Sequence, residues 1–372
     1  MGNSKYKILT VVGARPQFIK AAAISRTVKD KYADSICEDI LHTGQHYDDN
    51  MSGRFFAELN IPQPRYNLGV GSGPHGRQTA RMLEGIEEVL TSEHYDGVLI
   101  YGDTNSTLAG ALAASKLHVP VFHVEAGLRS RNMAMPEEVN RVVADRVSSL
   151  LFAPTEAACA NLQAEGFSDE IIVNSGDVMF DNALYFSDVA EISTDIMERL
   201  GLKDSEYVLA TVHRDFNTDS PDRLNAILGA LEQLEASGLK VVLPLHPRTR
   251  GRLGSDQHRL GTVIEPVSYL EMLRLERHAA VVLTDSGGVQ KEAYFFGRPC
   301  VILRPETEWV EIVECGAGEL ADADEERIVS ACRKMYEKAV LKPDIYGDGH
   351  AAEKILKKIY FFIQYNYKIR VI

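Results

Sequence analysis

Tyr6-Lys-Ile-Leu-Thr-Val-Val12 runs directly into Gly13-Ala-Arg-Pro-Gln-Phe-Ile-Lys20 near the start of the chain. The first part is an apolar run of strand length, and the glycine after it permits a sharp turn. The proline then suits the first turn of a helix. The sequence therefore predicts a buried strand over Ile8–Val12, a tight turn and a helix, which together form the first part of a β-α-β unit.

The same succession of apolar run, turn and helical segment recurs along the chain. Its apolar runs are continuous rather than alternating, as expected for parallel strands that helices cover on both faces. We therefore expect an α/β fold with Rossmann-like, doubly wound sheets. The predicted strands are Ile8–Val12, Val98–Tyr101, Val119–Val124, Leu150–Ala153, Ile171–Val173, Tyr207–Val212, Lys240–Leu245, Ala280–Thr284 and Pro299–Leu303.

Two domains are expected from a chain of 372 residues, because single domains usually have about 100–200 residues. The predicted strands fall into two groups, one ending near Ala153 and the other beginning at Tyr207. The segment Asn174-Ser-Gly-Asp177 lies between them and predicts a boundary near residue 175. Functional residues are expected just after the strands, since open α/β sheets bind ligands at the carboxyl ends of their strands.

Composition and charge exclude several classes of protein. The formal net charge of −13 argues against nucleic-acid binding, which needs a basic surface, although a few arginines can still hold a small phosphorylated ligand. The five cysteines form no Cys-x-x-Cys pair, and no signal-peptide pattern opens the chain. No apolar run approaches the ~18 residues that span a bilayer. We expect a cytoplasmic protein without membrane contact, whose aromatic end, Ile359–Ile372, is a packed helix and tail.

Charged residues follow the predicted strands of the first half. Arg15 and Lys20 would flank a helix N-terminus, where backbone amides and the helix dipole favour an anion; the alternative is a solvated turn with ordinary charges. Three consecutive strand-end segments then each deliver a carboxylate, namely Asp103, Glu125 and Glu137. A single such acid is usually a helix cap, but three beside an anion site are typical of acid–base chemistry.

The second half repeats the arrangement with other side chains. His213 and Arg214 follow one predicted strand and His246 follows the next. A lone histidine is more often structural, so both interpretations stay open. Ser286-Gly287-Gly288 leads into a helix and offers backbone amides to a phosphate. Glu292, one helical turn further on, would accept hydrogen bonds from ribose hydroxyls.

Together these segments closely resemble the non-hydrolysing UDP-N-acetylglucosamine 2-epimerases. The resemblance covers nearly the whole chain, and its two central motifs, beginning at His123 and Pro136, are highly specific. The Asp285 motif is less specific, because related glycosyltransferases carry similar loops. The matching segments are Gly13-Ala-Arg-Pro16, Gln45-His46, Gly102-Asp-Thr104, His123-Val-Glu-Ala-Gly-Leu-Arg129, Pro136-Glu-Glu-Val-Asn-Arg141, His213-Arg214, Asp285-Ser-Gly-Gly-Val-Gln290, Thr307-Glu308 and Tyr346-Gly-Asp-Gly349.

The resemblance implies the GT-B architecture of two Rossmann-like domains that face a cleft. Residues 1–175, with a C-terminal helix over about 351–372 packing back on them, would carry the acid–base carboxylates, and residues 176–350 would bind UDP. It implies a homodimer that inverts C2 of a UDP-sugar by elimination of UDP to a glycal and re-addition, without NAD or an obligatory metal.

The resemblance also assigns roles to individual residues. It implies that the catalytic residues are Asp103, Glu125, Glu137 and His213. The residues expected to bind the UDP-sugar are Arg15, Lys20, Arg129, Arg141, Arg214, His246, Ser286, Gly287, Gly288, Glu292 and Glu308. A regulatory second site would include Gln45, His46, Arg77 and Gln78, for which an ordinary loop and helix face is the alternative.

The sequence departs from the family pattern at two positions. The family commonly reads His-Arg-x-Glu-Asn where this chain has His213-Arg-Asp-Phe-Asn217, so Phe216 replaces a glutamate. Lys291 stands where UDP-N-acetylglucosamine epimerases usually carry a glutamate, which resembles the branch acting on UDP-2,3-diacetamido-2,3-dideoxyglucuronate. Basic residues near the sugar would suit the carboxylate of that substrate. It is therefore the alternative to UDP-N-acetylglucosamine.

Three further functions are compatible with the same fold. A hydrolysing 2-epimerase would share the site but release free UDP. A glycosyltransferase would need an acceptor surface, which the sequence does not indicate. Phe216 raises the alternative of a non-catalytic sugar-nucleotide sensor, against which the retained carboxylates and His213 argue.

Overall fold

The computed structural model describes residues 5–44, 61–245, 262–336, 338 and 344–370. The chain divides into two compact units. Unit 1 comprises Met1–Asn182 together with Ile345–Ile372, and unit 2 comprises Ala183–Asp344. Each unit is built on one parallel sheet, so the α/β fold class predicted from the sequence is confirmed.

The sheet of unit 1 has seven strands, all paired in parallel. They are β1 (Tyr6–Val12), β2 (Ile36–His42), β3 (Tyr66–Asn67), β4 (Gly97–Tyr101), β5 (Val121–Val124), β6 (Leu150–Ala153) and β7 (Ile172–Asn174). Their order in the sheet is β3-β2-β1-β4-β5-β6-β7. The order of the strands reverses between β1 and β4, which makes this pair the topological switch point of unit 1.

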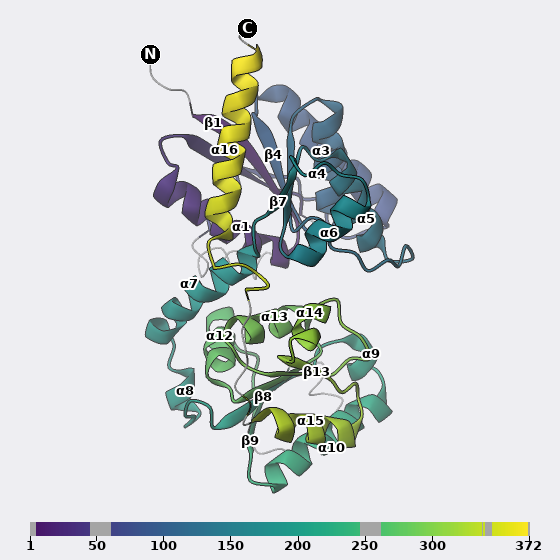
Figure 1. Ribbon diagram of the computed structural model, residues 1–372, viewed down its shortest axis with the longest axis vertical. Helices are drawn as coiled ribbons and strands as arrows, with labels where there is room; N and C mark the ends of the chain where they lie inside the picture. The colour runs from purple at the N-terminus through teal and green to yellow at the C-terminus, as the bar shows by residue number, and fades with distance from the viewer. Residues whose placement is uncertain (1–4, 45–60, 246–261, 337, 339–343, 371–372) are drawn as a thin grey trace. The chain divides into compact units, whose positions relative to one another are not determined.

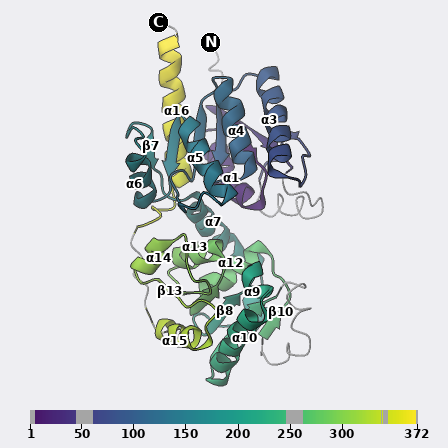
Figure 2. The same cartoon turned by 90° about the vertical axis from the view of Figure 1, so that its right-hand side faces the viewer.

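Helices cover the sheet of unit 1 on both faces (Figures 1 and 2). The helices are α1 (Arg15–Lys31), α3 (His75–Ser92), α4 (Asn105–Lys116), α5 (Pro136–Val147), α6 (Glu156–Ala164) and α16 (Ala351–Arg370), while α7 (Val178–Ser193) leads into unit 2. Figure 2 shows α3, α4 and α5 together over one face, where the alternate residues Val98 and Ile100 of β4 join the same core as these helices. The opposite face packs against α16, where the rings of Phe122 and Phe362 lie 5.6 Å apart.

The sheet of unit 2 has six parallel strands. They are β8 (Tyr207–Thr211), β9 (Lys240–Pro244), β10 (Thr262–Ile264), β11 (Val281–Thr284), β12 (Cys300–Ile302) and β13 (Gly318–Leu320). Their order is β10-β9-β8-β11-β12-β13, so the switch point of unit 2 lies between β8 and β11. Its helices are α8 (Ile196–Arg199), α9 (Asp215–Thr218), α10 (Pro221–Ala236), α12 (Tyr269–His278), α13 (Gly287–Phe295), α14 (Val310–Glu314) and α15 (Glu325–Tyr336).

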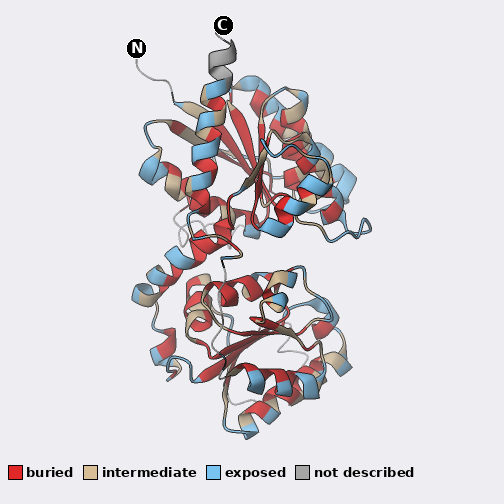
Figure 3. Ribbon diagram, in the orientation of Figure 1, coloured by how far each residue is buried: buried red, intermediate tan, exposed pale blue. Residues whose placement is uncertain are grey.

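Alternate residues of the strands of unit 2 pack into two separate cores. Val208 and Leu283 belong to the core that α10 and α15 cover, whereas Leu209 and Val282 belong to the core with α12 and α13. Central strands such as β4, β5, β8 and β11 are consequently buried along their length, and Figure 3 shows buried strands within both units. Burial on both faces explains why their sequences are continuously apolar.

The boundary between the units differs from the predicted one at residue 175. The chain stays with unit 1 as far as Asn182, inside α7. Asp177 donates its backbone N–H to the Tyr346 carbonyl at 3.0 Å. The Asp181 carboxylate accepts hydrogen bonds from the backbone N–H groups of Ala351 and Ala352 at 2.9 and 2.8 Å. These bonds attach the start of α16 to the first turns of α7, so both segments belong to unit 1. Within the ranges given above, no helix is sufficiently long and apolar to cross a membrane.

Candidate active site

The turn between β1 and α1 is fixed by a glutamine that the sequence analysis did not select. Gln17 accepts hydrogen bonds from the backbone N–H of Gly13 at 2.8 Å, and it donates to the carbonyl of Tyr101 at 2.8 Å. A Cβ at position 13 would lie 2.0 Å from Ser106 Oγ and 2.3 Å from Thr43 Oγ1, so only glycine fits. The two strands at the switch point of unit 1 are thereby tied together at their carboxyl ends.

Glu125 forms an ion pair with Lys20 at this end of the sheet. Both side chains are largely buried, at 10% and 12% exposure. Glu125 follows β5 with a φ of 69°, a left-handed conformation that costs a non-glycine residue about 1–3 kcal/mol and is concentrated at functional sites. A Cβ at Gly102 would lie 3.2 Å from Glu125 Oε2 and from Lys20 Nζ, so the turn after β4 passes directly against this pair. The structure thus brings Lys20 to a carboxylate, whereas the sequence predicted that it binds phosphate.

Asp103, in the same turn, pairs with Arg141 of α5. The distance from Arg141 to Asp103 Oδ2 is 2.5 Å, and the guanidinium also contacts Glu138 at 2.8 Å. Burial alone would raise the pKa of Glu138, but the backbone N–H groups of Ser130 and Arg131 and the Arg141 guanidinium together lower it. Arg141 therefore holds a candidate catalytic carboxylate.

Two other predicted residues of unit 1 lie at its surface. Glu137 is exposed in the first turn of α5, and it makes no hydrogen bond or ion pair with the described part of the chain. Arg15 is exposed at the first position of α1. The structure neither joins Glu137 to the Lys20–Glu125 pair nor assigns it a role, so its participation in catalysis stays a prediction.

Arg129, which the resemblance assigns to substrate binding, forms ion pairs inside unit 1. Its guanidinium is 5% exposed and pairs with Asp145 and Glu165, each at 2.7 Å. Burial would raise the pKa of Asp145, but His123 and Arg129 together lower it. His123 is fully buried and contacts Asp145 Oδ1 at 2.7 Å and the Gly102 carbonyl at 2.8 Å. Two acids inside unit 1 thus hold this arginine, and its contact with the substrate stays a prediction.

Asp285 organises the switch point of unit 2. It is fully buried after β11 and accepts hydrogen bonds from the backbone N–H groups of His213 and Arg214, at 3.0 and 3.1 Å. Asn217 of α9 donates to the same carboxylate at 2.9 Å. The side chains of His213 and Arg214 are exposed, on a loop whose backbone Asp285 holds. Asp285 and Asn217 lie within segments that the family resemblance compares, but neither was predicted to be a site residue.

The N-terminus of α13 is the predicted phosphate site. Gly287 and Gly288 are its first residues, and Ser286 before them donates its backbone N–H to Thr284 Oγ1 at 3.0 Å. A Cβ at Gly287 would lie 2.3 Å from Glu308 Oε1, and Glu308 also pairs with Arg304 at 2.7 Å. A carboxylate therefore lies against this helix N-terminus, as the helix dipole favours. Glu308 is therefore a neighbour of the predicted diphosphate site.

Two charged residues further along α13 are buried. Glu292 is 7% exposed and accepts a hydrogen bond from the Tyr269 hydroxyl at 3.3 Å. Lys291 is 3% exposed, and its ammonium lies 4.2 Å from the centre of the Trp309 ring. Burial and then the charge of Glu292 raise the pKa of Glu276, in the adjacent α12, well above its ordinary value.

Phe216, which departs from the family pattern, and two residues assigned to regulation, Arg77 and Gln78, lie among the described residues. Phe216 is exposed on α9, where the Arg223 guanidinium lies 5.3 Å from its ring centre. Gln78 of α3 is buried and donates to the Gly71 carbonyl at 2.8 Å, while Arg77 is exposed. Gln45, His46 and His246 lie outside the described residues.

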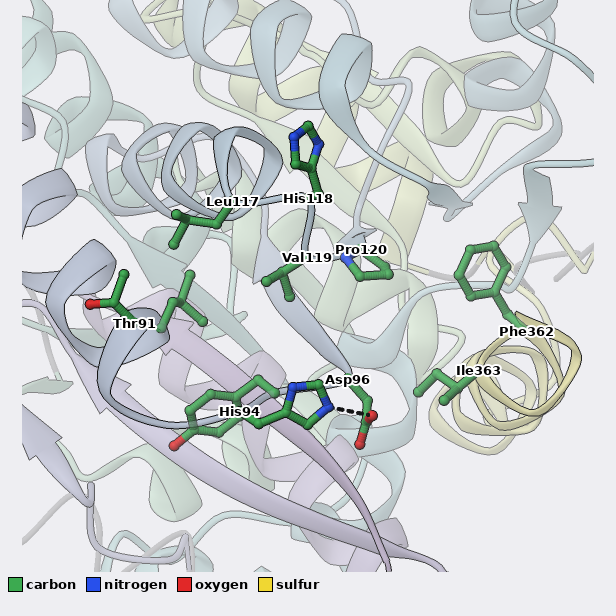
Figure 4. Close-up of a pocket in the computed structure, with 11 residues that line it drawn as sticks. Thr91, His94, Asp96, Leu117, His118, Val119, Pro120, Phe362 and Ile363 are labelled. Carbon is green, nitrogen blue, oxygen red and sulfur yellow. Dashed lines mark hydrogen bonds and ion pairs between the residues drawn. The ribbon is translucent and has the colours of Figure 1, made fainter. Parts of the chain in front are cut away.

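A separate cavity of about 370 Å³ lies at the other end of the sheet in unit 1 (Figure 4). Its lining comes from the segments that precede β4 and β5 and from α16, including His94, Asp96, His118 and Phe362. None of the predicted site residues lines it. Among the described residues, no group of three or more histidine, cysteine, aspartate or glutamate side chains is arranged to hold a metal ion.

Comparisons with known proteins agree with this geometry. The sequence model of the UDP-N-acetylglucosamine 2-epimerase family matches residues 30–360. The UDP-2,3-diacetamido-2,3-dideoxy-D-glucuronate 2-epimerase of Pseudomonas aeruginosa is 51% identical over 94% of this chain and 98% of its own length. The UDP-N-acetylglucosamine 2-epimerase of Escherichia coli K12 is 32% identical over 95% of this chain and 98% of its own.

A solved structure extends this similarity to the fold. The crystal structure of Methanocaldococcus jannaschii UDP-GlcNAc 2-epimerase in complex with UDP-GlcNAc and UDP is 42% identical. It superposes with a TM-score of 0.82 over 96% of this chain and 100% of that one. The match thus covers nearly the whole of both chains. This chain therefore belongs to the UDP-N-acetylglucosamine 2-epimerase family.

Proposed function

We propose that this protein is a non-hydrolysing 2-epimerase that interconverts UDP-N-acetylglucosamine and UDP-N-acetylmannosamine. The observation that carries the proposal is the paired carboxylates at the strand ends of unit 1, Glu125 with Lys20 and Asp103 with Arg141. A carboxylate can act as a general base, and each of these two acids has a cation beside it. Inversion at C2 needs such a base on one face of the sugar and a proton donor on the other.

The proposed reaction proceeds in two steps. A carboxylate removes the C2 proton, the electrons of that bond form the C1–C2 double bond, and the bond from C1 to the diphosphate oxygen breaks. The intermediates are a glycal and UDP. A proton then returns to the opposite face of C2 while UDP adds back to C1. One C2–H bond and the C1–O bond break in the first step, and both are formed again in the second. The reaction therefore consumes no oxidant or reductant.

The proposal assigns the UDP group to unit 2. The leaving diphosphate gains negative charge as the bond to C1 breaks, and donors placed where charge develops lower the barrier. The backbone amides of Gly287 and Gly288 at the N-terminus of α13 are such donors, with Arg214 as a further cation. Asp285 fixes the loop that carries Arg214 and His213. Glu292 would accept from the ribose hydroxyls.

Other expectations from the sequence accompany this proposal. Elimination and re-addition are redox-neutral, so the proposed reaction needs no NAD. The Gly287 and Gly288 amides and Arg214 would supply the charge stabilisation that a metal ion gives in other enzymes. Homodimerisation and a cytoplasmic location stay predictions. The regulatory role of Gln45, His46, Arg77 and Gln78 likewise stays a prediction.

A second candidate substrate is UDP-2,3-diacetamido-2,3-dideoxyglucuronate. Two observations favour it, the 51% identity to the Pseudomonas aeruginosa enzyme and the buried Lys291 close to the α13 N-terminus. Burial of an ammonium is costly, and the face of the Trp309 ring offsets part of that cost. The carboxylate of a uronate would add an anionic contact at Lys291.

The experiment that tests the function is turnover of each UDP-sugar in D₂O, followed by proton NMR. We expect inversion at C2 with deuterium incorporated at that carbon. Product that retains only protium at C2 would contradict proton abstraction there, and stoichiometric free UDP would identify a hydrolysing enzyme instead. The ratio of kcat/KM for the two substrates, compared with the same ratio for Lys291→Met, decides between the candidates. A uronate enzyme loses its preference in the variant, whereas a UDP-N-acetylglucosamine enzyme does not.

A further inference from the structure

One buried carboxylate of unit 1 connects the loops that follow β4 and β5. Asp145, in α5, is fully buried and accepts a hydrogen bond from the backbone N–H of Gly127 at 3.2 Å. Gly127 belongs to the loop that begins with Glu125. The other oxygen of Asp145 contacts His123, whose second ring nitrogen contacts the carbonyl of Gly102 at 2.8 Å. Gly102 immediately precedes Asp103.

Both hydrogen-bond partners of His123 are acceptors. A backbone carbonyl can only accept, so the ring nitrogen that faces Gly102 donates. The other ring nitrogen faces the Asp145 carboxylate, which also pairs with Arg129 at 2.7 Å. Arg129 pairs in turn with the partly exposed Glu165, so these four side chains form one connected set.

We propose that Asp145 and His123 are positioning residues that set the separation of the two catalytic loops carrying Asp103 and Glu125. This inference rests on the function proposed above. Asp145 reaches the Glu125 loop directly and the Asp103 turn through the imidazole, so the two catalytic carboxylates are placed by one rigid, fully buried connection.

The connection through Asp145 and His123 restrains a loop with a strained backbone at Glu125. Glu125 has a φ of 69° and Gly102 a φ of 62°, both in the left-handed region. A non-glycine residue remains there only where the surroundings hold it, so the Glu125 loop needs an external restraint. Asp145 supplies that restraint two residues away, at Gly127. Displacement of a reacting group by about 1 Å lowers turnover about 100-fold, which sets the scale of the expected effect.

The first test compares two substitutions of Asp145. Asp145→Ala removes both contacts, and we expect kcat to fall about 100-fold while the dissociation constant of UDP, bound by unit 2, changes less than about twofold. Asp145→Asn keeps an acceptor for Gly127 and an N–H for a neutral His123, so it should restore most of kcat. Equal losses in both variants, or kcat within about threefold of wild type in folded Asp145→Ala, would overturn the proposal.

A matched control separates positioning from general loss of stability. Asp39 is a largely buried acid of β2 that accepts from the Tyr95 hydroxyl at 2.8 Å and pairs with Arg65 and Lys7, away from the catalytic loops. Asp39→Ala should lower the melting temperature as Asp145→Ala does and leave kcat unchanged. If it lowered kcat equally, the effect of Asp145 would be structural and the proposal wrong.

Chemical rescue tests the imidazole itself. His123→Ala should lose about 100-fold in kcat, and added imidazole, which donates from both nitrogens when protonated, should restore at least about tenfold of it. 1-Methylimidazole fills the same space but cannot donate at both ends, so it should not restore activity. Equal rescue by both compounds would show that the ring only fills space.

A measurement without substrate keeps this proposal separate from the proposed function. If wild-type protein exchanged no hydrogen at C2 of either UDP-sugar, the function would be wrong. Nitrogen-15 NMR of the His123 ring still decides the connection: a ring that is hydrogen-bonded at both nitrogens, and amide shifts of Gly127 and Asp103 that change together in Asp145→Ala, support it. A ring nitrogen without a hydrogen bond, or a change confined to Gly127, would overturn it.

Discussion

The two switch points of this protein have the same topology and opposite chemistry. In unit 1 the turns after β4 and β5 present the acidic side chains Asp103 and Glu125, and cations from α5 and α1 pair with them, Arg141 with Asp103 and Lys20 with Glu125. In unit 2 Asp285 is buried and binds backbone N–H groups, while the side chains of His213 and Arg214 are exposed. The same fold can therefore serve proton transfer in one unit and anion binding in the other, according to which residue follows each strand.

If unit 1 serves proton transfer, the largest loss of turnover should follow substitution of Glu125, the carboxylate paired with Lys20. Glu125→Gln keeps the shape of the side chain but removes its capacity to accept a proton. We expect kcat to fall about 1,000-fold, within the range for loss of a general acid or base, with little change in UDP affinity, since UDP is assigned to unit 2. Steady-state kinetics and titration calorimetry with UDP measure the two quantities. Equal losses would make Glu125 a binding residue, and exposed Glu84→Gln serves as the control.

The converse prediction concerns unit 2. Asp285→Asn places an N–H group among the donors of His213, Arg214 and Asn217, which leaves buried donors unsatisfied and frees the loop. We expect UDP affinity to fall about 50-fold, or about 2.3 kcal/mol. The same titration measures it. Exposed Asp222→Asn should leave affinity unchanged, and a variant with wild-type affinity but reduced kcat would remove the division of roles between the units.

A third prediction concerns the close approach at the turn after β1. Gly13→Ala places a methyl group 2.0 Å from Ser106 Oγ and 2.3 Å from Thr43 Oγ1. Overpacking of this kind costs about 2 kcal/mol, so the free energy of unfolding measured in urea should fall by that amount. At Gly73 the same added atom meets nothing within 4 Å, and Gly73→Ala should be nearly neutral. Similar losses in both variants would mean that the turn adapts and does not require glycine.

Much of the fold could be predicted because its strands are continuous apolar runs. The central strands β1, β4 and β11 were located to within two residues at each end. β2 was missed because Glu38 and Asp39 interrupt its apolar pattern. Glu38 accepts from the Thr10 hydroxyl at 2.6 Å and Asp39 from the Tyr95 hydroxyl at 2.8 Å, so partners distant in sequence satisfy both acids. β3, β10 and β13 were also missed, because none of them lies in a run of three consecutive apolar residues, as the equally short β7 and β12 do.

The residues of the candidate site also divide into those that the sequence could indicate and those that only tertiary contacts show. The rule that ligands bind at strand ends identified Asp103, Glu125 and Ser286, because it depends only on local order along the chain. It could not identify Asp145, which lies in the last turn of a helix and whose proposed importance comes from contacts with Gly127 and His123. It could not show the ion pairs of Arg129 either, since the acids that bind this arginine are 16 and 36 positions further along the chain.

The smallest predicted effect contrasts two buried carboxyls, one in each unit. His123 and Arg129 outweigh burial and lower the pKa of Asp145, so its stabilising contribution is present at neutral pH and is lost as the pH falls through its folded value. Burial raises the pKa of Glu276, whose carboxyl oxygens make no hydrogen bond within the described chain. The unfolded chain releases this proton above about pH 4.3 while the folded chain retains it, so Glu276 destabilises unit 2 increasingly as the pH rises.

Glu276→Gln should therefore change stability in a pH-dependent way. The amide resembles the neutral acid, so the variant should match wild type at pH 4 and exceed it by on the order of 1 kcal/mol at pH 8. Urea unfolding at both values, with exposed Glu326→Gln as the control, measures the difference. A gain of the same size at pH 4 would mean that packing changed and not protonation. A loss at pH 8 would mean that Glu276 is ionised in the folded protein and that its charge makes a favourable contact which the amide lacks.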